Sequence, residues 1–286
     1  MNDNDDKFIL PFIIGAVSGL ASIILVAFSV ISQTIKTYKT KDHNFGSLVT
    51  FSTYLFSALS YFTWALLFLL FELSKATQPF GVWEWLYYLS SITLNSIGTV
   101  CSTLITIFIV RAMIARRKTW AECKKDISNW VVSTNDVRKA NGLGKIVMFF
   151  RTKLGFALAG GLLFVGLFVL ICLCKAYDWK TLELSNTQIA LLLVTNSVGA
   201  ITWTIVNWPL FFSTCKRDEI KKISIWYIIF NIISAFILVI FGVIGMYITG
   251  WYPTTIFGCI FNSSGSSLLI LYWKIKSITH KTKNRN

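Results

Sequence analysis

The segment Ile223–Trp273 reads ISIWYIIFNIISAFILVIFGVIGMYITGWYPTTIFGCIFNSSGSSLLILYW and contains no charged residue over 51 positions. A helix needs about 20 apolar residues to cross the hydrocarbon core of a bilayer, so this segment is too long for a single span. Gly250-Trp-Tyr-Pro253 interrupts it with helix-breaking residues and an aromatic pair typical of the membrane–water boundary. We therefore expect two membrane-spanning helices here, at approximately 223–249 and 254–273.

Five other segments meet the same requirement of length and hydropathy, and the overall composition agrees with them. Apolar residues make up 55% of the 286 residues and charged residues only 14%, whereas a soluble chain carries about 25% charged residues. The sequence therefore predicts an all-α membrane protein with seven transmembrane helices. The five additional spans are expected at approximately 8–31, 48–71, 85–110, 154–174 and 187–212.

Lysine and arginine gather in the loops on one predicted side of the membrane. Of the 27 Lys and Arg residues, 23 fall in segments that would share that side, and 4 fall on the other side. Positively charged loops stay in the cytoplasm, so we expect the N-terminus outside and the C-terminus inside. We attribute the net charge of +14 to this orientation and to contact with anionic lipids of the inner leaflet, and we expect no nucleic-acid binding. The basic segments are 32–47, 111–153, 213–222 and 274–286.

A four-residue motif occurs twice within apolar segments. Asn95-Ser-Ile-Gly98 recurs 167 residues later as Asn262-Ser-Ser-Gly265. A second match lies upstream of each copy. Ser32-Gln33 is followed by a basic loop and then by Ser47, 15 residues after Ser32. Pro209-Leu210 is likewise followed by a basic loop and then by Ser224, 15 residues after Pro209. This order of features predicts two parallel repeats of three helices, related by an axis along the membrane normal.

The repeat divides the chain into four parts. Residues 1–112 form the first three-helix repeat, with spans 1–3, and residues 184–275 form the second, with spans 5–7. Residues 113–183 contain a basic cytoplasmic loop and the linker span 4, and residues 276–286 form a basic cytoplasmic tail. Because three is an odd number of crossings, the linker span is needed to give both units the same orientation. We describe this as a 3+1+3 arrangement.

With these motifs, the chain resembles the PQ-loop transporter superfamily, which includes the SWEET and SemiSWEET sugar transporters. The resemblance covers spans 1–3 and 5–7, about two thirds of the chain. Ser32-Gln33 keeps the glutamine of the Pro-Gln pair and loses the proline, whereas Pro209-Leu210 keeps the proline and loses the glutamine. Ser47 and Ser224 match the serines that open the second helices. The resemblance implies a transporter whose site asparagines are Asn95 and Asn262.

The paired asparagines are also the main candidates for a binding site on physical grounds. Leaving an amide unpaired in hydrocarbon is costly, so a mid-membrane asparagine needs a partner. Asn95 and Asn262, helped by Ser96 and Ser263, would face each other across the repeat axis and hold a small neutral polar solute, sugar-like or amino-acid-like. The alternative is that both asparagines only bridge helices by hydrogen bonds.

Other residues are weaker candidates for the same site. Each of these residues has an alternative explanation without a role in transport, which is ordinary helix packing or, for the proline, the end of a helix. The additional substrate-binding candidates are Trp64, Trp203, Asn196 and Asn231. The hinge or gating candidates are Gln33 and Pro209, which belong to the two dipeptides that match the Pro-Gln pair. Pro209 would act as a hinge because proline removes a backbone hydrogen bond and kinks a helix.

Several kinds of chemistry are not expected from this sequence. The centres of the predicted spans contain no Asp, Glu, Lys, Arg or His, which favours a uniporter over a proton-coupled carrier. The chain has two histidines and six cysteines, with no C-x-x-C pair, so we expect no metal site and no cofactor. No nucleophile is paired with a base, and we expect the protein not to be an enzyme.

Two other functional classes fit the same composition. A seven-transmembrane receptor or signalling protein would share the topology, although it would not need the duplicated Asn-Ser-x-Gly motif. A membrane assembly or trafficking factor is the second alternative. The abundance of Lys, Asn and Ile over Arg and Pro is typical of an AT-rich genome and favours a bacterial cell membrane. The expected partners are the solute and membrane lipids, and a homo-oligomer is left open.

Overall fold

The computed structural model describes residues 5–76, 79–117, 186–210 and 219–249 continuously, together with some shorter stretches. All regular structure in these residues is helical, and no strand occurs among them. The shorter described stretches are residues 119, 122, 145, 149, 152, 154–155, 267–268, 270–272 and 274–275.

Five of the described helices are long and apolar enough to cross a membrane, so the prediction of an all-helical integral membrane protein is confirmed. They are α1 (Asp5–Thr40), α2 (Phe45–Lys75), α3 (Val82–Ala115), α8 (Asn186–Ile205) and α10 (Ile225–Thr249). A short 3-10 helix, η2 (Glu219–Lys222), precedes α10. The predicted spans at 154–174 and 254–273 lie largely outside the described residues. The count of seven spans and their orientation therefore stay predictions.

Helix ends in the polar loops use residues that satisfy free backbone groups. The side chain of Asn44 caps α2 by accepting a hydrogen bond from the Gly46 N–H at 2.6 Å. At the start of α3, Glu84 Oε2 accepts from the Gly81 N–H at 2.7 Å. Lys41, which follows α1, has a φ of 47°, the left-handed conformation that commonly ends a helix. These caps set the turns at which the apolar helices reverse direction.

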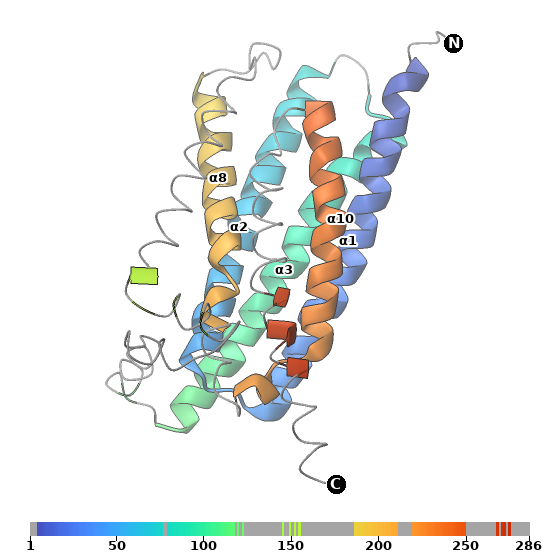
Figure 1. The fold of residues 1–286 in the computed structure, drawn as a ribbon. Helices are drawn as coiled ribbons and strands as arrows, with labels where there is room; N and C mark the ends of the chain where they lie inside the picture. Colours follow the sequence, from blue (N-terminus) through green and yellow to red (C-terminus); the bar gives the residue numbers. More distant parts are fainter. Residues whose placement is uncertain are drawn as a thin grey trace.

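The helices pack as a bundle in which helices of the first predicted unit pack against helices of the second (Figure 1). Helix α3 packs against both α1 and α2 of its own unit. Helix α1 also packs against α10, and α2 packs against α8, so each contact joins the first unit to the second. Two hydrogen bonds cross these interfaces at 2.9 Å, from Ser29 Oγ to Tyr227 O and from Ser57 Oγ to Gly199 O.

Glycines allow α1 to approach α3 closely. A Cβ atom at Gly15 would lie 2.7 Å from Tyr87 Cδ2, and one at Gly19 would collide with the side chain of Ser90. Small residues let helix backbones approach without a loss of packing, which is a usual way to join helices in a membrane. The absence of a side chain at these two positions therefore sets the distance between α1 and α3.

The two ends of the bundle differ in character. At the end away from the basic loops lies an aromatic cluster, which we define as Trp64, Phe68, Tyr87, Tyr88 and Phe241. Trp64 stacks on Phe68 with ring centroids 5.5 Å apart, and Tyr87 lies 5.1 Å from Phe241. The opposite end, which we call the basic end, contains the loop between α1 and α2, the end of α3, and η2. Its basic residues are Lys36, Lys39, Lys41, Arg116, Arg117, Lys221 and Lys222.

Candidate functional site

A cavity of about 50 Å³ lies between the five long helices. Every one of these helices contributes to its wall, so it lies at the centre of the described bundle. Its lining residues are Val26 of α1; Tyr54, Ala58, Tyr61 and Trp64 of α2; Ser91, Leu94, Asn95 and Gly98 of α3; Trp203 of α8; and Leu238 and Phe241 of α10.

Three of the predicted substrate-binding residues, Asn95, Trp64 and Trp203, meet at this cavity. They come from α3, α2 and α8, and they are far apart in the sequence. Gly98, one turn beyond Asn95, also lines the wall, and a Cβ atom there would lie 3.3 Å from Tyr54 Cε1. The sequence singled out these positions as polar or aromatic groups within the predicted spans, and their common location is a property of the packed structure.

The amide of Asn95 is held by its own helix. Its Nδ2 donates a hydrogen bond to the backbone carbonyl of Ser91 at 2.8 Å. A carbonyl can only accept, so this contact assigns the NH₂ group to the Ser91 side. The side chain of Asn95 is partly buried, and its Oδ1 is the amide atom left to accept a hydrogen bond at the cavity.

The two tryptophans differ in how they are held. Trp64 is 1% exposed and stacks on Phe68 at an interplanar angle of 8°. Trp203 is 9% exposed, and its ring centroid lies 5.1 Å from that of Tyr54. The Nε1 atom of Trp203 is buried and has no hydrogen-bond partner among the described residues. An indole N–H is only a donor, so the cavity wall contains a donor that lacks an acceptor.

The remaining substrate-binding candidates lie elsewhere or outside the described residues. Ser96 donates to the Ile92 carbonyl of its own helix at 2.8 Å and does not line this cavity. Asn196, which is 3% exposed, also lies away from the cavity wall. Asn262 and Ser263 fall outside the residues that the structure describes, so the predicted meeting of the two site asparagines stays a prediction.

Asn231 belongs to a second polar cluster, nearer the basic end. Its Nδ2 donates to Ser267 Oγ at 3.0 Å, and Asn207 Nδ2 donates to the same oxygen at 3.2 Å. The Tyr227 hydroxyl donates to Asn207 Oδ1 at 3.1 Å. All four residues are buried. Asn231 therefore ties α10 to the α8 end and to residue 267, as the helix-bridging alternative for a membrane asparagine requires.

Gln33 connects α1 to the segment that begins α10. Its side chain is 1% exposed, and its Oε1 accepts from the Ser224 N–H at 2.8 Å. Its Nε2 donates to Thr37 Oγ1 at 3.1 Å and to the Lys222 carbonyl at 3.4 Å. The predicted hinge glutamine of the first unit thus holds the start of a helix in the second unit.

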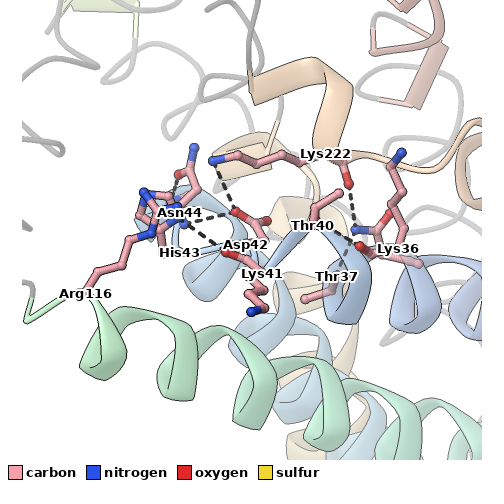
Figure 2. A network of polar contacts seen from close by, with 11 residues as sticks. Lys36, Thr37, Thr40, Lys41, Asp42, His43, Asn44, Arg116 and Lys222 are labelled. Carbon is pink, nitrogen blue, oxygen red and sulfur yellow. Dashed lines mark hydrogen bonds and ion pairs between the residues drawn. The ribbon is translucent and has the colours of Figure 1, made fainter.

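Further polar contacts hold the 219–224 segment at the basic end, around Asp42 and Lys222 (Figure 2). Asp42 is 1% exposed, and its Oδ1 lies 3.7 Å from Lys222 Nζ and accepts from the Asn44 N–H at 3.0 Å. From the other side, Lys274 Nζ donates to two backbone carbonyls of the segment, at 2.6 and 2.9 Å. The loop after α1 and the end of the chain therefore both bind this connection.

Pro209 lies just after an interruption of α8. The helix ends at Ile205, residues 206–207 form a turn, and residues 208–210 are helical again. Proline lacks an N–H and its ring clashes with the carbonyl four residues earlier, which here is Ile205. The break therefore has a local cause in Pro209, and its use as a hinge stays a prediction.

Several cavity residues were not predicted, among them Val26, Tyr61, Leu238 and Phe241. A signal for them exists in the repeat, because Ser47 and Ser224 are 177 positions apart. The same offset relates three pairs of lining residues: Val26 with Trp203, Tyr61 with Leu238, and Trp64 with Phe241. Half of the lining residues therefore occupy equivalent positions of the two predicted units.

The cavity offers aromatic faces and a few polar groups, and its lining residues carry no carboxylate, amine, guanidinium or imidazole. Such a wall can hold and release an uncharged solute. In the described part of the chain, no group of three His, Cys, Asp or Glu side chains is placed to hold a metal ion. Comparison with models of protein families, with curated proteins and with solved structures found no match to this chain.

Proposed function

We propose that this protein is a membrane carrier that moves a small neutral polar solute, sugar-like or amino-acid-like, by alternating access. The units 1–112 and 184–275 would rock about the cavity between them, as in a PQ-loop transporter, and open it to one side of the membrane at a time. The observation that carries the proposal is the central cavity lined by equivalent positions of both units, such as Trp64 and Phe241.

The contacts between the two units support a two-fold symmetry axis that relates one unit to the other. If α1 corresponds to α8, and α2 to α10, then the contact of α1 with α10 corresponds to the contact of α8 with α2. An axis along the membrane normal would interchange these two contacts, which is the symmetry of parallel repeats in transporters. The seven-span topology with the N-terminus outside completes the proposal, supported by the 23 to 4 division of basic residues.

Closure on both sides of the cavity also fits alternating access. The aromatic cluster, of which Trp64 and Phe241 line the cavity, lies toward one end, and the contacts of Gln33 and Asp42 with the 219–224 segment lie toward the other. Opening one end requires only its own contacts to break. Because the described residues that line the cavity carry no charged group, we favour transport down the gradient of the solute, without ion coupling.

The test is uptake by purified protein in liposomes, using a panel of labelled sugars, neutral amino acids and other uncharged solutes. Asn95→Ala should lower uptake about tenfold or more, because it removes the cavity acceptor, while insertion and elution volume stay normal. Thr93→Ala is the matched control, since Thr93 lies on the same helix with an exposed side chain that does not line the cavity. Full uptake by the Asn95 variant would refute this site.

A further inference from the structure

Two polar groups of the cavity wall have fixed and opposite roles, beside the indole N–H of Trp64 and the hydroxyls of Tyr54, Tyr61 and Ser91. The Nδ2 of Asn95 is engaged by the Ser91 carbonyl at 2.8 Å, so Asn95 presents Oδ1, an acceptor. Trp203 presents Nε1, a donor that is buried and has no partner among the described residues. A solute that satisfies both must offer an N–H or O–H at one point and an oxygen or nitrogen acceptor at another.

This polarity separates classes of solute. A carboxylate only accepts hydrogen bonds and leaves Asn95 Oδ1 without a donor. An alkylammonium only donates and leaves Trp203 Nε1 without an acceptor. An amide has a carbonyl and an N–H in one plane and therefore satisfies both groups at once. A buried group left unpaired costs about as much as a tenfold or larger loss of affinity.

The rest of the wall disfavours a solute with many hydroxyl groups. Most of the lining residues are aliphatic or aromatic, and their rings come from α2, α8 and α10. A hexose has five hydroxyls, and those facing aliphatic and aromatic surface would lose water without gaining a partner. A flat molecule instead places one face against the aromatic wall that Tyr54 and Trp203 form in contact with each other.

The size of the cavity points the same way. At about 50 Å³, it is smaller than the engineered apolar cavity of about 150 Å³ that binds benzene. The present walls therefore suit a compact solute, and a sugar would require them to move much further apart.

From these four observations we propose that the solute is a compact, flat, uncharged amide, of the carboxamide or ureide class. Its carbonyl accepts from Trp203 Nε1, its N–H donates to Asn95 Oδ1, and its plane lies against the aromatic wall. This inference rests on the proposed carrier function and narrows its substrate.

The experiment measures solute flux into liposomes that contain the full-length protein, relative to protein-free liposomes. The amide probes are urea and acetamide, and the polyol probes are glycerol and glucose. N,N-dimethylacetamide keeps the carbonyl but has no N–H, so it tests the contact with Asn95. We expect protein-dependent flux of the amides to exceed that of the polyols and of N,N-dimethylacetamide by about tenfold, the effect of one lost hydrogen bond.

Two variants test the assigned donor. Trp203→Phe keeps an aromatic ring and removes the N–H, and it should lower amide flux about tenfold. Trp226→Phe is the matched control, because Trp226 is 57% exposed on α10 and does not line the cavity. It should leave the flux unchanged.

The outcomes separate the two proposals. Flux of glucose or glycerol without flux of the amides would overturn the amide assignment and leave the carrier function standing. If none of these probes shows protein-dependent flux, and none of the sugars and neutral amino acids of the first uptake panel does either, both proposals are overturned. Amide flux that is unchanged in a folded Trp203→Phe variant would overturn the role of its indole N–H.

Discussion

Replacing Gln33 by leucine should loosen the basic end of the bundle by a calculable amount. The substitution keeps the volume roughly constant and removes three hydrogen bonds, to Ser224 N, Thr37 Oγ1 and Lys222 O. The first two are well formed and contribute about 1 kcal/mol each, and the longest contributes less. The closed arrangement therefore loses about 2 kcal/mol, which raises the population opened at the basic end by roughly 30-fold.

Cysteine labelling can measure this change. Ser47, at the start of α2, is 5% exposed in the closed arrangement. In a background without the native cysteines, Ser47→Cys should react with a maleimide about 30-fold faster when Gln33→Leu is present, because the reaction follows the open population. Thr34→Val is the matched control, since Thr34 Oγ1 bonds only to the Val30 carbonyl of its own helix in these contacts. An unchanged labelling rate in a folded Gln33→Leu protein would refute the reasoning.

Three further predictions concern the contacts that hold the helices together. Asp42→Asn should lower the stability of the protein by about 1–3 kcal/mol, because it leaves the ammonium of Lys222 without its buried counter-charge. A double-mutant cycle with Lys222→Met, read by denaturant titration, should show coupling between the two residues, and additive effects would contradict the ion pair. Gly19→Leu should cost about 1–3 kcal/mol or more, since its side chain would enter the space of Ser90. Gly81→Ala, where a Cβ atom would lie 3.7 Å from the nearest atom of Glu84, should shift the melting temperature far less, and equal shifts would argue against close packing at Gly19.

The helical architecture could be predicted from local composition, and the spans expected at 8–31, 48–71 and 85–110 lie inside α1, α2 and α3, which extend further at both ends. The span expected at 187–212 differs from the structure in where its helix ends. The sequence treats it as one apolar run, whereas α8 ends at Ile205 and resumes after a turn. Pro209 had been identified as a possible kink, and the carbonyl that its ring excludes lies four residues earlier, which is where the helix stops.

The candidate site was only partly predictable, and the asparagines illustrate why. Asn95 and Asn231 are both polar residues within apolar runs, and in the sequence only the repeated Asn-Ser-x-Gly motif makes Asn95 the stronger candidate. The structure separates them by their partners, because Asn95 lines the cavity whereas Asn231 bonds to Ser267. Which partner an amide meets depends on the rotation of its helix and on residues far away in the chain.

The aromatic walls show the same limit. Tyr54 and Tyr61 were not singled out, since aromatic residues are frequent in this chain and their types alone do not indicate burial at a cavity. Their role follows from the packing of α2 against α8, where Tyr54 meets Trp203 and Tyr61 lies against Gly199. The 177-residue offset between the units would have suggested Tyr61 once Leu238 was known to line the cavity.

The sequence by itself determined that this chain forms apolar helices, which segments contain them, and which few polar residues they carry. The reason is that a bilayer supplies no hydrogen bonds, so each span must satisfy its backbone within itself, and that demand is met by neighbouring residues. The tertiary structure alone decided that Asn95, Trp64 and Trp203 share a cavity and that Gln33 binds the segment before α10. These contacts depend on how side chains from distant helices fit together, which no local stretch of the chain contains.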